Sequence, residues 1–310
     1  MIEKTKKRST FQIGLISGKG GVGKTSISSS FGVIFHELGK KVLVADCDVD
    51  APNLGLLFQS GEVLEQKTVQ TTEKSLFLPE LCIQCKRCVD EEFCKFNALS
   101  WDSSINMPVV DSIACEGCGA CYELCPEHAF EIHAIDSGTI SHERTKYGFD
   151  LVWGETRLGA QTSGKLVTEI KKIVNHTIEA NNLELAIIDG PPGIGCPVIA
   201  TVTDLDYVIV IVEPTSTALH DADRAIQMLN QLRRNYGIVI NKADMWKSGY
   251  DIIVNYAKKH DIEILGEIPV DMTIPQAIVN GLPVYTFNPQ SPSSKALKII
   301  TRNIVNHFLS

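Results

Sequence analysis

Apolar runs alternate with segments of helical spacing in two stretches of the chain, residues 11–58 and 147–309. The first run, Phe11 to Ile16, precedes a helix-like segment from Ile27 to Leu38, and the next run, Lys41 to Asp46, ends in an acid. Short apolar runs of this kind are typical of buried parallel strands. Their alternation with helices predicts an α/β fold with a doubly wound, mostly parallel sheet.

The second stretch continues the same alternation. Leu166, Ile170, Ile173, Val174 and Ile178 share one face of a helix expected over residues 163–180. The amphipathic segment 293–309 fits an ordinary last core helix, with attachment to a membrane surface as the alternative. Further strands are expected at Phe149–Trp153, Leu185–Asp189, Tyr207–Val212, Gly237–Asn241 and Glu263–Ile268.

The pattern stops between these two stretches. Residues 60–78 are polar with few signals, and we interpret them as a linker. A cysteine-rich segment follows. The sequence therefore predicts three parts: residues 1–60 and 147–310 form one α/β domain, and residues 61–146 form a second domain, with linkers, inserted at its edge.

Composition and charge narrow the possible functions. The 310 residues are 44% hydrophobic and 21% charged, which is ordinary for a soluble globular protein. A formal net charge of −8 argues against a protein that coats nucleic acid or an anionic membrane. No apolar run approaches the ~20 residues of a membrane span, and the start lacks a secretory signal pattern. We expect a cytoplasmic protein.

A glycine-rich loop lies between the first expected strand and the first expected helix. Gly18 to Ser26 matches G-x-x-x-x-G-K-[ST], the P-loop pattern. Its glycines let backbone N–H groups cradle phosphate oxygens, Lys24 reaches the β and γ phosphates, and the Thr25 hydroxyl completes a Mg²⁺ site. We expect a nucleoside triphosphate here, bound by Gly20, Gly21, Val22, Gly23, Lys24, Thr25 and Ser26.

A second lysine, Lys19, lies inside the loop and gives the form K-G-G-x-G-K-[ST]. With it the sequence resembles the MinD/ParA (Mrp-like) superfamily of deviant P-loop ATPases, which includes the nitrogenase iron protein. The resemblance implies that Lys19 reaches the nucleotide of a partner subunit, so that ATP holds two protomers together as a homodimer or as a heterodimer with a related ATPase. A second ammonium there would stabilise charge that grows in the transition state. The alternative is a solvated lysine.

The resemblance also assigns roles at the ends of later strands. It implies that Asp48 orients the attacking water and that Asp46 supports Mg²⁺ through water. Leu185 to Gly193 matches the Walker B and switch II segment, where Asp189 would help to hold Mg²⁺. Asn241 would recognise the adenine edge through its amide, and Pro269 lies in the loop expected to close over the base.

Eight of the ten cysteines fall between Cys82 and Cys125. A disulfide framework needs an oxidising compartment, so metal binding is the better interpretation. The run from Cys115 to Cys125-Pro126 is the C-x₂-C-x₂-C-x₃-C-P signature of bacterial ferredoxins, in which the fourth cysteine ligates the other cluster. This predicts two [4Fe–4S] clusters in a small α+β ferredoxin-like domain: cluster one on Cys82, Cys85, Cys88 and Cys125, and cluster two on Cys115, Cys118, Cys121 and Cys94.

The first cysteine run departs from that signature. Five residues instead of three precede Cys94, and Lys95 replaces proline. Zinc knuckles, or one cluster only, are the alternatives, although the triple spacing occurs twice. Outside this segment only Cys47 and Cys196 remain. We interpret Cys47 as a core residue. A minor alternative is that Cys196 ligates a cluster shared between two subunits.

These motifs support three functional hypotheses. In the first, an ATPase couples a nucleotide-driven dimer cycle to electron transfer through the clusters, with an unidentified redox partner protein. The segment from Glu80 to Glu131 contains ten acids and three basic residues. This negative charge favours low reduction potentials of the clusters and a basic redox partner. The second is an ATP-dependent carrier of iron–sulfur clusters. The third is a MinD-like positioning ATPase with a redox sensor.

Overall fold

The computed structural model describes residues 10–309, except 60, 158, 161–162 and 216. The chain divides into two compact units. The first comprises residues 1–66, 140–155 and 167–310, and the second comprises residues 67–139 and 156–166. The chain therefore enters the second unit twice.

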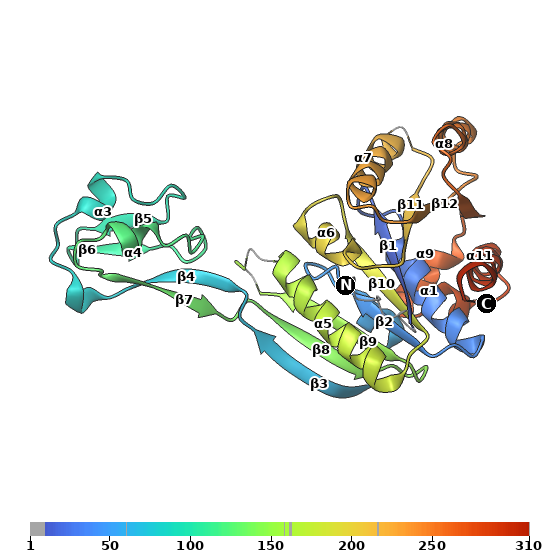
Figure 1. Cartoon of the computed structure of the whole chain (residues 1–310), viewed down its shortest axis with the longest axis horizontal. Coiled ribbons are helices and arrows are strands. Elements are labelled where there is room, and N and C mark those ends of the chain that lie inside the picture. The colour runs from blue at the N-terminus through green and yellow to red at the C-terminus, as the bar shows by residue number, and fades with distance from the viewer. Residues whose placement is uncertain (1–9, 60, 158, 161–162, 216, 310) are drawn as a thin grey trace, which may run out of the picture. The chain divides into compact units, whose positions relative to one another are not determined.

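Within its described residues, the first unit is built on a sheet of nine strands in the order β13-β12-β11-β1-β10-β2-β9-β8-β3 (Figure 1). The pairs from β13 to β9 are parallel. The strands are β1 (Phe11–Ser17), β2 (Val42–Asp46), β3 (Glu62–Val69), β8 (Gly138–Arg144), β9 (Asp150–Thr156), β10 (Leu185–Pro192), β11 (Tyr207–Val212), β12 (Tyr236–Asn241) and β13 (Ile264–Ile268).

Helices cover both faces of this sheet. Helices α1, α10 and α11 pack together over one face, and α6 and α7 pack against β10, β1 and β11. The helices are α1 (Lys24–Glu37), α2 (Leu54–Phe58), α5 (Ser163–Asn181), α6 (Cys196–Val202), α7 (Ala218–Gln231), α8 (Lys247–Lys259), α9 (Thr273–Val279), α10 (Val284–Phe287) and α11 (Pro292–Phe308). The prediction of an α/β fold with a large, mostly parallel sheet is confirmed.

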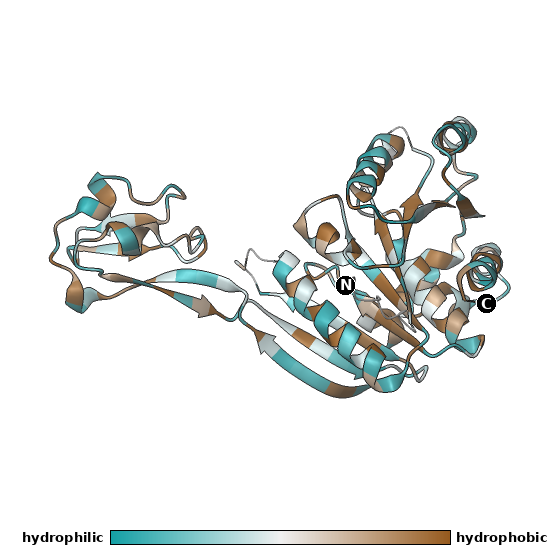
Figure 2. Ribbon diagram, in the orientation of Figure 1, coloured by the Kyte–Doolittle hydropathy of each residue, from teal (hydrophilic) through white to brown (hydrophobic). Residues whose placement is uncertain are grey.

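The central strands are buried on both faces, which explains their continuous apolar runs. Every residue of β2 and β11 is buried, and Figure 2 shows hydrophobic residues concentrated in the middle of the sheet. The last helix, α11, contributes Leu297, Ile300 and Ile304, each about 1% exposed, to the same core. Among the described residues, no helix is both long and apolar enough to cross a membrane.

The second unit contains two small antiparallel pairs, β4 with β7 and β5 with β6. Its core includes Cys88, Phe93 and Phe130. Its elements are β4 (Thr72–Phe77), a 3₁₀ turn η1 (Pro79–Leu81), α3 (Arg87–Asp90), β5 (Leu99–Asp102), β6 (Met107–Val110), α4 (Ala120–Leu124) and β7 (Phe130–Ile135).

The interpretation of residues 60–78 as a linker is wrong. Strand β3 lies at an edge of the large sheet, and β4 pairs with β7 from Thr72 to Phe77. Most of β3 is exposed, so its side chains carry no apolar pattern that periodicity could detect. In β4 the buried positions are the polar Thr72, Lys74 and Ser75, which a search for apolar residues passes over.

Candidate functional site

The P-loop lies between β1 and α1, as the sequence predicts. Gly21 and Gly23 adopt φ values of 77° and 95°, in the left-handed region that favours glycine. A Cβ atom on Gly23 would lie 2.5 Å from Nδ2 of Asn241. The loop also contacts switch II, because the N–H of Gly193 donates to the carbonyl of Ser17 at 2.9 Å. The backbone conformation of this loop thus favours glycine at positions 21 and 23.

Lys24 begins α1 and is only 7% exposed. Its Nζ donates to Oγ of Ser17 at 3.0 Å. Burial lowers the pKa of Lys24, and the nearby carboxylates of Asp189, Asp48 and Asp46 act in the opposite direction. The structure therefore brings the P-loop lysine together with the three acids that the sequence singled out.

Asp46 and Asp189 are aligned partners at the carboxyl ends of β2 and β10. Both carboxylate oxygens of Asp189 are buried, and among the described residues neither makes a hydrogen bond of ordinary geometry, although the Thr25 hydroxyl lies near them. Burial, reinforced by the Asp46 charge, raises the pKa of Asp189 to about 8, while Lys24 and the nearby Thr25 hydroxyl lower it. A buried carboxylate without a donor is costly unless a cation pairs with it. Asp189, Asp46 and Thr25 therefore offer the hard oxygen ligands that suit Mg²⁺.

Asp46 also shapes the switch I loop. Its carboxylate accepts backbone N–H groups from Asp48 at 3.0 Å, Asn53 at 2.9 Å and Leu54 at 3.0 Å. The side chain of Asp48 is half-buried, and burial raises its pKa while Lys24 lowers it. Asp48 thus lies close to Lys24 and remains partly accessible.

Lys19 is not free in this structure. Its Nζ lies 2.9 Å from Oε1 of Glu213 and 3.1 Å from Oγ1 of Thr215. The other oxygen of Glu213 lies 2.8 Å from Nζ of Lys242. Burial alone would raise the pKa of Glu213, but hydrogen bonds from the two lysines outweigh it and the pKa falls.

Sequence reasoning missed Glu213 as a site residue. The signal was available, because Glu213 follows directly after the buried strand β11, and β11 pairs with β1, which leads into the P-loop. An acid at the carboxyl end of a parallel strand lies at the ligand-binding edge of the sheet.

A cavity of about 310 Å³ opens beside the P-loop. Asn241 lines it, but its Nδ2 donates to the carbonyl of Val22 at 2.7 Å and its Oδ1 accepts from the N–H of Lys242 at 3.0 Å. Asn241 therefore ties the end of β12 to the P-loop. Pro269 lines a different cavity, while its neighbours Ile268 and Val270 line this one.

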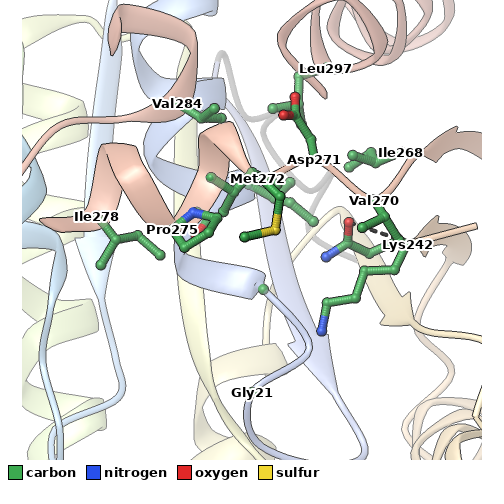
Figure 3. A pocket seen from close by; sticks show the side chains of 15 residues that line it. Gly21, Lys242, Ile268, Val270, Asp271, Met272, Pro275, Ile278, Val284 and Leu297 are labelled. Atoms are coloured by element: carbon green, nitrogen blue, oxygen red, sulfur yellow. Dashed lines mark hydrogen bonds between the residues drawn. The ribbon is translucent and has the colours of Figure 1, made fainter. Parts of the chain in front are cut away.

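The remaining wall of this cavity is apolar except for Asp271 and comes from the last part of the chain. Figure 3 shows Met272, Pro275 and Ile278 on one side and Lys242 on the other. An apolar, partly enclosed cavity next to a phosphate-binding loop suits a nucleobase and its ribose. Sequence reasoning missed these residues, since apolar residues of α9 to α11 cannot be distinguished from ordinary core residues.

The eight clustered cysteines line two separate small cavities of the second unit, of about 20 Å³ each. The first cysteine site consists of Cys82, Cys85, Cys88 and Cys125. The second cysteine site consists of Cys94, Cys115, Cys118 and Cys121. Each site thus combines three closely spaced cysteines with one from the other run.

The four cysteines of each site line the wall of one cavity. Among the described residues, no three His, Cys, Asp or Glu side chains form a site for a single metal ion. A tetrahedral zinc site needs ligands that converge on one ion. In a four-iron cluster each thiolate binds a different iron, so its ligands must be spread around a cavity. Each cavity has four cysteines in its lining, which is the number of thiolates that such a cluster needs.

The two remaining cysteines differ in exposure. Cys47 is fully buried, and burial strongly raises the pKa of its thiol. Cys196 is exposed at the start of α6. Cys47 thus lies in the core, as expected, where it cannot join Cys196 on a subunit-bridging cluster.

Comparisons with known proteins agree with this geometry. Residues 13–284 match the family model described as the CobQ/CobB/MinD/ParA nucleotide binding domain. The uncharacterized protein MJ0578 of Methanocaldococcus jannaschii is 40% identical over 272 residues, which cover 87% of this chain and 88% of that protein. The iron-sulfur cluster carrier protein of Pyrococcus furiosus is 24% identical and covers 98% of this chain and 89% of its own length.

A solved structure with the same fold is the MinD cell division protein of Aquifex aeolicus. Its TM-score is 0.58 at 21% identity, with 96% of this chain and 98% of that chain covered. At this level of identity the likeness concerns the fold alone. The family match rests instead on the sequence from β1 to α10. The chain belongs to the CobQ/CobB/MinD/ParA nucleotide binding domain family of P-loop ATPases.

Proposed function

We propose that the protein hydrolyses ATP in a nucleotide-dependent dimer and couples this cycle to electron transfer through two [4Fe–4S] clusters held in a ferredoxin-like second unit. The observation that carries the proposal is the combination, in one chain, of a P-loop facing buried acids and two cavities lined by four cysteines each. The partner subunit would be a second copy or a related ATPase.

The nucleotide site supplies the groups that phosphoryl transfer to water needs. ATP would place its base in the apolar cavity and its phosphates on the N–H groups of the P-loop. Asp48 would orient a water molecule toward the γ phosphorus, and the bond to the bridging oxygen of ADP would break as the new bond forms. Lys24 would stabilise the charge that shifts onto the phosphate oxygens.

Mg²⁺ is the divalent cation that these acids fit. Thr25 and Asp189 would hold it, and Asp46 would support it through water while shaping the switch I loop. The ion would neutralise charge on the β and γ phosphates. Asp189 would lose its proton when the ion binds, because burial and the Asp46 charge raise its pKa and a bound cation would oppose both effects.

Lys19 would complete the site across a dimer. In the single chain Glu213 and Thr215 hold its ammonium. To act on a partner's nucleotide, Lys19 would have to exchange this carboxylate for phosphate oxygens. The Lys19–Glu213 pair is therefore a candidate for the contact that breaks when two protomers close on ATP.

The two cysteine sites would hold the clusters through four thiolates each. A bound [4Fe–4S] cluster accepts and releases single electrons at a potential set by charge, hydrogen bonds and exposure. Cys85 and Cys118 are exposed, whereas the other ligands are buried or half-buried. One cysteine of each site therefore faces solvent, where a redox partner could approach.

Cluster delivery is the second candidate. It is favoured by the relatives called iron-sulfur cluster carrier proteins, such as that of Pyrococcus furiosus, at 24% identity over nearly the whole chain. Four cysteines around each cavity favour tight retention of a cluster on the protein instead. A carrier would hold its cargo on fewer and more exposed thiolates.

One experiment separates the two candidates. The anaerobically purified protein would be reduced with dithionite and mixed either with an oxidised electron acceptor or with an apo-ferredoxin, each with and without Mg·ATP. Electron transfer predicts that ATP changes the oxidation rate while iron and sulfide stay on the protein. Cluster delivery predicts iron in the apo-ferredoxin. A colourless, iron-free protein would contradict both.

A further inference from the structure

The two cysteine sites are closely matched in exposure. Each contains one buried cysteine, one exposed cysteine and two of intermediate exposure. The buried ones are Cys88 in the first site and Cys115 in the second, and the exposed ones are Cys85 and Cys118. Solvent exposure of the ligands, which affects cluster potential, therefore does not distinguish the sites.

The backbone hydrogen bonds to sulfur are partly matched as well. In the first site, Cys82 accepts the N–H of Gln84 at 3.4 Å and Cys125 accepts that of Ala129 at 3.4 Å. The second site repeats both contacts at the same sequence offsets, from Gly117 to Cys115 at 3.4 Å and from Ala98 to Cys94 at 3.2 Å. These matched hydrogen bonds affect the reduction potentials of both clusters alike, so they do not distinguish the two sites.

Strand β4 adds two contacts that have no counterpart among the hydrogen bonds described for the first site. The N–H of Ser75 donates to Sγ of Cys115 at 3.4 Å, and Oγ of Ser75 lies 3.1 Å from Sγ of Cys121. A metal-bound thiolate has no proton to give, so there the Ser75 hydroxyl must be the donor. Ser75 is buried, which strengthens both contacts.

A buried cation lies next to Ser75. Lys74 is 4% exposed, and its Nζ donates to the carbonyl of Cys115. The first site also has cations, Lys86 and Arg87, in its lining. Both are exposed, and Arg87 is paired with Glu91 at 2.7 Å. Water and Glu91 screen them, whereas the charge of Lys74 is screened much less.

We propose that Ser75 and Lys74 set the second cysteine site at a higher reduction potential than the first, so that a single electron on the protein resides on the second cluster. This inference rests on the proposed function, because it presumes that both clusters are bound. Reduction adds one negative charge to a cluster without forming or breaking a bond. Hydrogen-bond donors and a nearby cation stabilise the reduced form more than the oxidised form, which raises the potential.

The test is an EPR-monitored redox titration of the anaerobic holoprotein with dithionite as the reductant. Two unequal midpoint potentials are expected. Ser75→Ala should lower the higher midpoint potential and leave the lower potential unchanged. The expected shift corresponds to a change of up to about tenfold in the equilibrium constant for reduction, which is about 59 mV for a one-electron couple. Ser75→Thr keeps the hydroxyl and should restore the higher potential.

Controls assign the signals and separate the possible failures. Cys88→Ser, which removes a ligand of the first site, should leave the higher potential and abolish the lower one. Ser100→Ala changes an exposed serine of the same unit and should alter neither. Equal potentials, or a Ser75→Ala protein that keeps its iron and both potentials, would overturn the inference while the proposed function stands. Absence of cluster iron from the wild-type protein would overturn the proposed function itself, and the inference with it.

Discussion

The ammonium of Lys19 lies 2.9 Å from a carboxylate oxygen of Glu213 in the same chain. The lysine is about a third exposed, whereas Glu213 is almost buried and also pairs with Lys242. In a closed dimer the proposed target of Lys19 is a phosphate of the partner's nucleotide. Glu213 and that phosphate would then compete for one cation.

Glu213→Gln should therefore promote ATP-dependent dimerisation. A partly exposed ion pair contributes about 0.5–1 kcal/mol, so its loss should lower the dimer dissociation constant about two- to fivefold. Sedimentation velocity with ATP measures the effect. Glu184→Gln removes a partly exposed ion pair with Lys40 and serves as the control. Weaker dimerisation of Glu213→Gln would mean instead that Glu213 holds Lys19 in its active position.

Lys19→Ala should retain nucleotide binding and lose hydrolysis. Lys24 and the backbone of the P-loop remain to hold the phosphates, but the second ammonium at the transition state is gone. By analogy with a charge supplied in trans, turnover should fall about a thousandfold. Steady-state phosphate release and fluorescent-nucleotide titration measure the two properties separately. Unchanged turnover would show that Lys19 is only a solvated lysine.

Lys24→Ala should abolish nucleotide binding and leave the clusters intact. Its ammonium makes charge-assisted contacts with phosphate, so affinity for ATP should fall about a hundredfold or more. The cysteine sites belong to the other compact unit, so visible absorption and iron content should match those of the wild-type protein. Loss of iron in this variant would contradict the separation of the two sites.

Asp189 makes stability depend on pH when Mg²⁺ is absent. Burial raises its pKa from 3.8 to about 8. Between these values the folded protein keeps a proton that the unfolded chain has released, so the free energy of unfolding falls as the pH rises and levels off above about pH 8. In Asp189→Asn the melting temperature should decline less between pH 5 and 8. Parallel curves for the two proteins would contradict this account.

Paired cysteine substitutions test which cysteines share a cluster. Cys94→Ser combined with Cys115→Ser alters only the second site, so about half of the iron should remain. Cys94→Ser combined with Cys88→Ser alters both sites and should remove most of it. Iron and acid-labile sulfide analysis distinguishes the outcomes. Equal iron contents in the two double variants would contradict the partition of ligands described above.

The grouping of the P-loop with several acids was predictable from the sequence. The P-loop glycines, Lys24, Asp46 and Asp189 stand directly at the ends of apolar runs, and parallel strands bring such ends together. The cysteine spacing likewise anticipated the two groups of four that line the cavities.

Other features depend on which strands become neighbours, and the sequence alone does not show this. Glu213 became part of the site only because β11 pairs with β1. Lys74 and Ser75 lie in the stretch that the sequence predicts to be a linker. The prediction fails there because a two-stranded ribbon has no continuous apolar face that periodicity could detect. Asn241 lines the cavity, as a residue predicted to recognise a base could, but its contacts with Val22 and Lys242 were not predictable.

The second unit is assembled from two separate lengths of chain, 67–139 and 156–166. Arg157 pairs with Asp136 at 3.4 Å and donates its N–H to the carbonyl of Ser137, and Lys165 donates to the carbonyl of Thr71. Lys165 lies in the first turn of α5, which continues into the other unit as far as Asn181. Excising residues 67–139 would therefore not yield a bare ATPase. It would remove the residues that Arg157 and Lys165 contact. Gain or loss of this module by a single cut is therefore not a neutral event for the ATPase.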